Sequence, residues 1–519
     1  MTPSAIAGQA VELWGRPSRS AHSSPRLNLV LVIAVTVALA ATVDAAPTKP
    51  PGVQQRAVGV NRLEMQLTNA GSFASDHLFG GADYGFGLEF PRGSEKYLAF
   101  AGGVWFAGRA AGNLRTAVAE YATEFVPGPA IAGGPGVDTV RFAVYSIRRG
   151  DTTGAGEWMA RAVPLGAPVN AAGTGPGLIG DQTLWTVCTD AGVTSQIYNL
   201  GPRTPIGLEV QVTAYAFDRA PALQDVVFMH VRLIHKGSEP LDDAHVGLWY
   251  DADIRTAGIP AGCDSSLDIG YVYRTTDDAE YGVAGPATGI CVLRGPAGAE
   301  RPSAIVAWPN GADPPDAGAR EGVLHGLYPW GPPMLDSTTF QPTKFYAWGD
   351  PVTGTGWLMP NVLDPKLVLS MGPLALAPGD TVDVDAAVVV GQGADRAGSV
   401  TALRDNVREA RAAFADGFRL VPEPRLTAVG RLIARPVPSP GALVFDLVVP
   451  PGGAEVRVDI LDLNGRRVRA IHAGALEGGL NHVVWDGKRD DGERARPGIY
   501  FARARAAGTE SSARVVLIP

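Results

Sequence analysis

The stretch DVVFMHVRLIHKGSEPLDDAHVGLWYDADI, residues 225–254, decides the fold class of this 519-residue chain. Apolar side chains occupy alternate positions from Val227 to Leu233, with His230 and Arg232 between them. A period of two is typical of a half-buried antiparallel strand, with one face in the core and one in water. The polar segment at 236–243 separates this run from a second one, so we expect two neighbouring strands joined by a turn.

Similar runs, divided by Gly, Pro, Asp and Asn, recur along residues 56–420. Lys96–Gly108 is interpreted as two strands around Gly102-Gly103, and residues 205–219 as a further strand. The run DTVDVDAAVVVGQG at 380–393 indicates a buried strand. The fold class predicted for residues 56–420 is all-β, a large β-sandwich-type region. It is left open whether this region contains two subdomains.

One helix is predicted firmly, at Ser399–Phe418. Its apolar positions follow a spacing of three and four, with Ser399 as the expected N-cap and Gly417 as the expected stop. A single helix after a long series of strands is expected to pack against a sheet or to cover its edge.

The N-terminus has the pattern of a secretory signal peptide at 1–45. Arginines precede the apolar run LVLVIAVTVALAATV at 29–43, and small residues follow it. A membrane anchor is the alternative, but it needs about 20 apolar residues. A linker is expected at 46–55, and no later segment has the length and apolarity of a transmembrane segment.

Composition argues against nucleic-acid partners and limits the number of disulfides. The chain has 44 Lys and Arg against 52 Asp and Glu, a net charge of −8, which argues against nucleic-acid binding. Three cysteines allow at most one disulfide, and Cys263–Cys291 is the favoured pair over those with Cys188 because both flank one short region.

The C-terminal part has its own strand and turn pattern. A linker is predicted at 421–430 and an immunoglobulin-like β-sandwich at 431–519. Asn464-Gly465 is a hairpin signal, since a tight primed turn favours positive φ at both residues. The strands at 481–487 and 498–506 are expected to pair around the turn at 490–492.

This tail resembles the C-terminal sorting domain of type IX secretion cargo and the immunoglobulin-like domain of flagellar hook-capping proteins. The residues that match are interpreted as structural, as turn formers and aromatic core residues. They are Asn464, Gly465, Trp485, Asp486, Gly487, Asp491, Gly492, Gly498 and Tyr500. The resemblance implies the secretion machinery as a partner and a secreted or outer-surface location in a Gram-negative bacterium. The opening strand lacks the Asn-Pro-Phe often found there.

Residues 60–420 resemble secreted bacterial proteins that carry such a tail and have no established activity. The stretches that match are GSEKYLAFAGGVWFAG, RTAVAEYATEF, GDQTLWTV, GLEVQVTAYAF and APGDTVDVDAAVVVGQGAD. This resemblance implies no reaction.

Candidate site residues are few. Asp251, Asp253 and Asp264 follow apolar runs and are predicted as ligands of calcium, the one cofactor that the sequence suggests. A solvated acidic loop and a catalytic carboxylate pair are the alternatives. Trp105, Trp185 and Trp249 lie in apolar runs and are expected in the core. The loop residues Trp330, Trp348 and Trp357 are candidates for a platform on which sugar rings stack.

No nucleophile, zinc or phosphate-binding motif occurs in the sequence. The favoured function is therefore that of a secreted or surface-bound, non-catalytic protein for adhesion, binding or structure. Its expected partners are surface glycans or other surface proteins. The alternative is a secreted hydrolase acting on glycans.

Overall fold

The computed structural model describes residues 52–76, 85–120, 123–131, 134–191, 204–218, 220–254, 259–277, 279–309, 312–360, 364–419, 432–449, 454–477, 479–506 and 509–518. The predicted signal peptide, residues 46–51 and the linker at 421–430 lie outside these residues. No helix within them is long and apolar enough to cross a membrane. Their secondary structure is mostly β-strand, as the alternating sequence pattern predicts.

Two large antiparallel sheets dominate the region up to residue 419. In the described residues, sheet 1 has the order β19-β22-β15-β8-β3-β2-β6-β7, with β1 beside β2 and β9 beside β8. Its strands are β1 (Gln55–Val58), β2 (Glu64–Thr68), β3 (Ser72–Phe73), β6 (Leu88–Glu89), β7 (Tyr97–Ala99), β8 (Ala101–Ala110), β9 (Asn113–Val118), β15 (Leu241–Asp251), β19 (Ala304–Pro309) and β22 (Pro365–Leu376).

Sheet 2 has the order β10-β12-β13-β14-β23-β18-β17-β16, with β11 beside β12. Its strands are β10 (Val126–Pro127), β11 (Tyr145–Arg148), β12 (Gln182–Thr189), β13 (Leu208–Ala216), β14 (Val226–His235), β16 (Ala261–Asp264), β17 (Ile269–Val272), β18 (Ala287–Arg294) and β23 (Thr381–Gly391). The short pairs β4 (Ser75–Asp76) with β5 (Gly85–Phe86), and β20 (Met334–Leu335) with β21 (Pro342–Thr343), lie outside both sheets.

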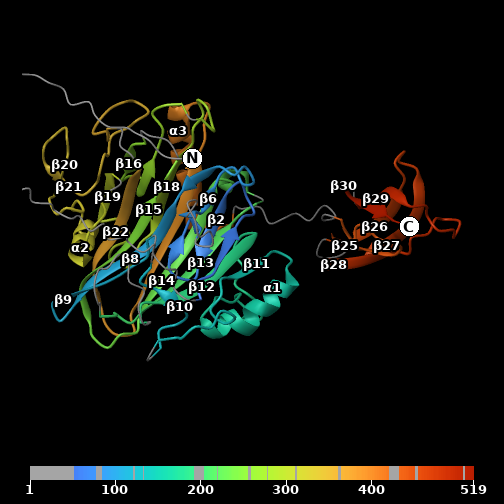
Figure 1. Ribbon diagram of the computed structural model, residues 1–519, viewed down its shortest axis with the longest axis horizontal. Helices are drawn as coiled ribbons and strands as arrows, with labels where there is room; N and C mark the ends of the chain where they lie inside the picture. The colour runs from blue at the N-terminus through green and yellow to red at the C-terminus, as the bar shows by residue number, and fades with distance from the viewer. Residues whose placement is uncertain are drawn as a thin grey trace, which may run out of the picture. The chain divides into compact units, whose positions relative to one another are not determined.

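The two sheets share one apolar core, so the region is a β-sandwich (Figure 1). Val104 and Phe106 of β8 belong to the same buried cluster as Val227 and Met229 of β14. The alternation predicted for β14 is confirmed, because residues 227, 229, 231 and 233 are buried while Arg232 is exposed. Burial of this core is the main favourable contribution to folding.

The predicted closing helix is present as α3 (Arg396–Ala415) and covers the outer face of sheet 2. It begins three residues earlier than expected, because Asp395 is the N-cap and accepts a hydrogen bond from the Gly398 amide. Ser399 is buried inside the helix instead of capping it. Gly417 ends the helix region with φ +69°, as predicted.

Two shorter helices were not predicted: α1 (Thr152–Glu157) and α2 (Ala317–Leu324). Single turns of other helix types occupy Trp158–Ala162, Val163–Leu165 and Pro221–Leu223. α2 is attached to sheet 1 by a buried ion pair, in which the Arg320 guanidinium donates to both Glu120 carboxylate oxygens at 2.9 and 3.0 Å. A helix of only eight residues needs such tertiary support.

The expected hairpin at 225–254 is wrong. β14 and β15 are both strands, but β14 lies in sheet 2 between β13 and β23, whereas β15 lies in sheet 1 between β8 and β22. The segment between them crosses from one sheet to the other. Both strands contribute apolar side chains to the shared core, and their apolar pattern does not depend on which sheet each one joins.

The break expected at Gly102-Gly103 is also misplaced, because both glycines lie inside β8. A Cβ atom on Gly102 would come within 2.3 Å of the Phe73 ring, and one on Gly103 within 2.2 Å of the Ala119 carbonyl. These glycines allow neighbouring groups to approach closely and do not end the strand.

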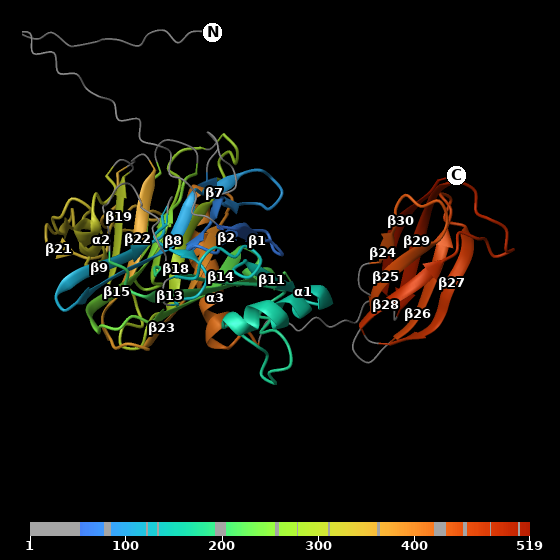
Figure 2. The same ribbon diagram turned by 60° about the horizontal axis from the view of Figure 1, so that its bottom comes forward.

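The C-terminal residues form an immunoglobulin-like sandwich of a three-stranded and a four-stranded sheet (Figure 2). The first is β24-β25-β28 and the second β27-β26-β29-β30, within the described residues. Their bounds are β24 (Ile433–Arg435), β25 (Leu443–Val449), β26 (Ala454–Leu461), β27 (Arg467–Leu476), β28 (Gly479–Trp485), β29 (Gly498–Ala506) and β30 (Thr509–Leu517). Trp485 is fully buried in their shared core, against Tyr500.

Two pairing details of this module differ from expectation. β28 and β29 do not pair, since β28 joins β25 and β29 joins β26 and β30. The Asn464-Gly465 hairpin is confirmed between β26 and β27, but only Gly465 has positive φ. Asp462 closes this turn by accepting hydrogen bonds from the Asn464 and Arg466 amides.

The favoured disulfide is absent. Cys188, Cys263 and Cys291 are all free and buried. Cys263 belongs to the core between the sheets and Cys291 to the cluster under α3, so the two face opposite sides of sheet 2. Burial raises the pKa of both thiols to about 12, which leaves them protonated at neutral pH.

Candidate functional site

The predicted calcium ligands occupy both sheets. Asp251 is buried at the end of β15 in sheet 1, and half-buried Asp253 follows it. Asp264 ends β16 in sheet 2, where it accepts hydrogen bonds from the Ser266 amide and hydroxyl and lies 3.5 Å from the Arg404 guanidinium. Among the described residues, the group of three whose ligand atoms lie within 4.8 Å of one another is a different one. Calcium binding at these aspartates stays a prediction.

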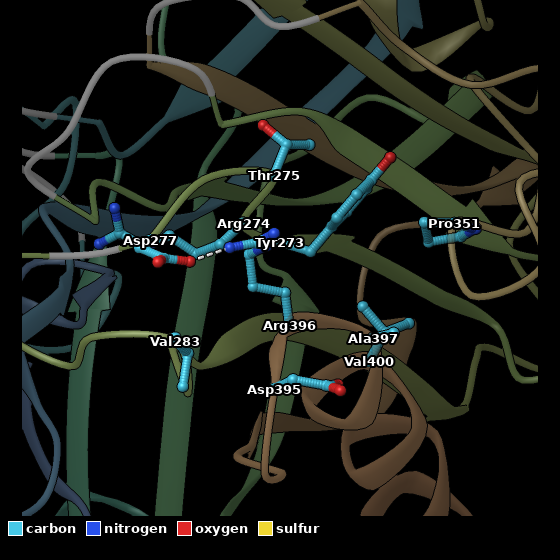
Figure 3. A pocket seen from close by; sticks show the side chains of 10 residues that line it. All are labelled: Tyr273, Arg274, Thr275, Asp277, Val283, Pro351, Asp395, Arg396, Ala397 and Val400. Carbon is cyan, nitrogen blue, oxygen red and sulfur yellow. Dashed lines mark hydrogen bonds and ion pairs between the residues drawn. The ribbon is translucent and has the colours of Figure 1, made fainter.

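A pocket of about 490 Å³ opens beside the N-terminal end of α3. Figure 3 shows the side chains that surround it. They come from the segment after β17, from a loop and from the start of the helix: Tyr273, Arg274, Thr275, Asp277, Val283, Pro351, Asp395, Arg396, Ala397 and Val400. Its size is in the range of small-molecule sites.

The two carboxylates of this pocket already have partners. Asp277 forms an ion pair with Arg396, drawn as a dashed line in Figure 3. Asp395 caps the helix through the Gly398 amide at 2.7 Å. A glycoside hydrolase needs one carboxyl that carries a proton and a second that acts as base or nucleophile. Two carboxylates engaged with an arginine and a helix end do not provide this arrangement, so the pocket gives the hydrolase alternative no support.

Several exposed apolar side chains belong to a loop region that we call the aromatic loop, residues 327–357. Trp330 is 55% exposed, Phe340 75% and Trp348 45%, and Leu335 is exposed as well. The loop includes the β20–β21 pair, in which Leu335 is opposite Pro342. A contiguous exposed apolar patch is typical of an interaction surface, whereas single exposed apolar residues are ordinary, so these side chains are candidates for such a surface.

The tryptophans divide largely as the sequence predicts. Trp105, Trp185 and Trp249 are fully buried. Trp330 and Trp348 are exposed, but Trp357 is buried against Tyr346 and does not belong to the surface. Trp330 stacks on Tyr328 with ring centroids 4.5 Å apart and planes at 8°, which holds one indole face parallel to a second ring.

Asp336 organises the aromatic loop. Its carboxylate accepts hydrogen bonds from the Thr338 hydroxyl and amide, each at 2.7 Å, and from the Trp348 indole at 2.8 Å. The Thr338 hydroxyl makes the largest contribution, and together with the other donors it outweighs burial and lowers the pKa of Asp336 to about 2. The exposed Trp348 ring is thereby held in a defined position.

A further cluster of polar side chains was missed in the sequence. Asp243, in a bulge of β15, lies beside His245 of the same strand and His325 at the C-terminal end of α2. The two imidazole centroids are 4.4 Å apart, and His325 Nε2 is 3.1 Å from Asp243 Oδ2. Burial is the main cause that lowers the pKa of His245, so this ring is neutral near pH 7.

Some of these features have a local signal in the sequence and others do not. Trp330 and Trp348 stood out because each lies among Gly and Pro in a loop. Phe340 has a similar signal, because it is a lone aromatic residue in a polar stretch. His325 and Asp243 are 82 positions apart, and no spacing rule connects them.

Most of the matching residues of the tail lie at turns or in the core, whereas Gly498 is the first residue of β29. Gly465, Gly487 and Gly492 have positive φ. Asp486 and Asp491 each accept a hydrogen bond from the amide two residues later. The Trp485 indole donates to the Lys488 carbonyl at 2.7 Å. These residues stabilise the fold of the module, so any function belongs to the domain as a whole.

One comparison with known proteins finds a match to this tail. Residues 441–510 match the family model of the FlgD Ig-like domain. No curated protein matches the chain. The C-terminal module is therefore similar in sequence to a known immunoglobulin-like family, in agreement with its two small sheets.

Three solved structures give low similarity. A polysaccharide lyase is 11% identical, with 89% of this chain and 47% of the lyase covered and a TM-score of 0.26. Dimeric latent PorU from Porphyromonas gingivalis is 12% identical, with coverage of 65% and 31% and a TM-score of 0.17. The adhesin domain of Epf from Streptococcus pyogenes is 8% identical, with coverage of 59% and 89% and a TM-score of 0.13. The chain spans about half the length of the lyase.

Proposed function

We propose that this is a secreted, non-catalytic surface protein, exported through its C-terminal module and binding surface glycans through the aromatic loop. The observation that carries the proposal is the match of residues 441–510 to the FlgD Ig-like domain, on a module with its own apolar core. The residue pattern that resembles type IX sorting domains adds the secretion machinery as the partner and the Gram-negative cell surface as the destination.

The aromatic loop supports the binding part of the proposal. Indole and phenyl faces that remain in water can stack on the apolar face of a sugar ring, and large aromatic residues contribute most of the affinity at many interfaces. Trp330 and Trp348 are each fixed by a second group, Tyr328 and Asp336. A rigid aromatic surface loses little conformational entropy when a ligand binds.

Export is tested by deleting residues 425–519 in a host that has the type IX machinery. We expect the shortened protein to stay folded in the periplasm while the full-length protein reaches the outside. As a positive control, residues 425–519 fused to a reporter should carry it out of the cell. Shortened protein in the medium at the full-length level would contradict this route.

Glycan binding is tested by affinity electrophoresis in gels that contain purified bacterial surface polysaccharides. Replacing both Trp330 and Trp348 with Ala should weaken retention about 30-fold, since losing central aromatic contacts costs roughly 2 kcal/mol or more. Phe501→Ala is the control, because Phe501 is an exposed aromatic residue of β29 in the C-terminal module. Equal retention of the double variant, or no retention of the unmodified protein, would argue against the loop as a glycan surface.

A further inference from the structure

The cluster of Asp243, His245 and His325 joins two separate elements of the large domain. β15 has a bulge opposite β8 between Asp242 and His245, and Asp243 adopts φ +52° there. α2 ends at Leu324, so His325 is its C-cap residue. An oxygen of Asp243 and one ring nitrogen from each histidine lie within 4.8 Å of one another. The bulge and the helix end thus bring three metal-ligating side chains together.

Each imidazole is oriented by a backbone carbonyl. The Nδ1 atom of His245 is 3.0 Å from the Asp243 carbonyl, and Nδ1 of His325 is 2.8 Å from the Glu321 carbonyl. A carbonyl oxygen only accepts hydrogen bonds, so Nδ1 carries the hydrogen in both rings and Nε2 of a neutral ring keeps its lone pair. Histidines that bind metals are commonly held by such a bond from the second ring nitrogen.

The surrounding packing also limits movement of the rings. His245 is buried, and a Cβ atom on Gly372 would come within 2.5 Å of its ring. Glu321 is held by Arg109 through a 2.7 Å ion pair, which fixes the last turn of α2 under His325. Asp243 and His325 remain partly exposed, so an ion from solution could reach them.

The contact between Asp243 and His325 needs a positive charge. Oδ2 of Asp243 and Nε2 of His325 are 3.1 Å apart, and both are acceptors when the ring is neutral. Two lone pairs at this distance repel each other unless a proton or a metal ion lies between them. A proton explains the contact of this one pair. It does not involve the ring nitrogen of His245, which lies within the same 4.8 Å.

We propose that Asp243, His245 and His325 bind a divalent transition-metal ion of the zinc class, with water completing the coordination. Two imidazole nitrogens and one carboxylate oxygen are a ligand set that zinc accepts, whereas calcium prefers oxygen ligands. Zinc–ligand bonds of about 2.0–2.1 Å in a tetrahedral site place the ligand atoms roughly 3.3 Å apart. The 3.1 Å between Asp243 and His325 already fits this spacing, and the other separations, at most 4.8 Å, would shorten by up to about 1.5 Å on binding.

The ion would tie the end of α2 to β15 directly before the aromatic loop, since His325 is followed by Gly326 and Leu327. The site is therefore structural for the base of that loop. The proposal does not depend on glycan binding, because the three ligands belong to β15 and the α2 cap and not to the aromatic surface.

The experiment titrates Zn²⁺ into the purified protein, without a histidine tag and after removal of metals with EDTA, by isothermal titration calorimetry at pH 7.5. Asp243→Asn and His325→Gln each remove one ligand. Asn tolerates the positive φ of residue 243, and residue 325 is partly exposed, so both variants should fold. Circular dichroism checks this for each variant.

His230→Gln is the matched control. His230 also lies beside carboxylates, with Nδ1 2.9 Å from Asp385 and Nε2 3.5 Å from Asp383, and its exposure is similar to that of His325. We expect one Zn²⁺ per chain in the unmodified protein and in His230→Gln, with affinity at least about tenfold weaker in the two ligand variants. Zinc should raise the melting temperature only where it binds.

Two results would overturn the proposal. One is the absence of a one-to-one zinc complex in the unmodified protein, which would mean that Asp243 and His325 form an ordinary ion pair. The other is zinc affinity that stays the same in Asp243→Asn and His325→Gln, which would place the bound ion elsewhere on the chain.

Discussion

Asp336 shows how a single side chain can organise a loop with little regular structure. Three donors within 2.8 Å, from Thr338 and Trp348, converge on its carboxylate. Hydrogen bonds to an ionised group are stronger than those between neutral groups. One buried aspartate therefore sets the position of an exposed indole, and the link between the two is electrostatic as well as geometric.

This link predicts an acid-sensitive loop. The pKa of Asp336 in the folded protein, about 2, lies below the ordinary value of about 3.9, so the carboxylate stabilises the fold above about pH 4 and loses this effect as the pH falls towards 2. The indole N–H resonance of Trp348, assigned with Trp348→Phe, should shift with a midpoint near 2. In Asp336→Asn this shift should disappear. A midpoint near 4 would show that the three hydrogen bonds do not favour the ionised form.

At the scale of elements, one arginine contributes several hydrogen bonds to the attachment of α3, besides the buried apolar face of the helix. The Arg411 guanidinium donates to the Leu267 carbonyl, to the Val292 carbonyl at 2.6 Å and to Asp268 at 2.8 Å. Leu267 and Asp268 directly precede β17 and Val292 lies in β18, so the arginine connects the helix to two neighbouring strands. The partners of Arg411 lie 119 to 144 positions away in the sequence, so no local pattern indicates them.

Replacing Arg411 with Met should lower the free energy of unfolding by about 2 kcal/mol or more, because hydrogen bonds that involve a charged group contribute roughly 1.5–3 kcal/mol each. Arg408→Met is the control, since Arg408 pairs only at the surface with Asp405 and should change stability by less than about 0.5 kcal/mol. Urea unfolding followed by circular dichroism measures both. Equal effects of the two substitutions would show that the Arg411 contacts do not stabilise α3.

Strand pairing is a second feature at the scale of elements. β14 and β15 follow one another in sequence but lie in different sheets, and the same is true of β28 and β29. β14 has an apolar face in the core shared by both sheets and a partly exposed face, whereas β15 is buried on both faces from Ala244 to Asp251. A short connection within one sheet and a crossing between sheets leave the same local pattern, so alternation identifies strands and their buried faces but not their neighbours.

At the scale of the whole molecule, the apolar cores separate along the sequence. The clusters around β8, β14 and α3 contain residues up to 418, and the cluster around Trp485 contains residues 432–517. A module of this size with its own core can fold alone. The boundary predicted at 421–430 lies outside the described residues and stays a prediction.

We expect residues 425–519, expressed alone, to melt cooperatively. Limited proteolysis of the full chain should cut first near residues 421–429, because two prolines there disfavour both helix and strand pairing, and should leave two resistant fragments. Mass spectrometry of the fragments locates the cut. An isolated tail without a thermal transition, or early cleavage elsewhere, would mean that the two parts need each other to fold.

The sequence by itself determined the strands, their buried faces, the closing helix with its stop at Gly417, and the immunoglobulin-like tail. These follow from local periodicity and turn chemistry, which depend on residues a few positions apart. The tertiary structure alone decided which strands share a sheet, that Asp264 has an arginine neighbour, that Trp357 is buried while Trp330 is exposed, and that Asp243 meets His325. Such relations depend on contacts between segments that are distant in the sequence, and a local pattern does not predict them.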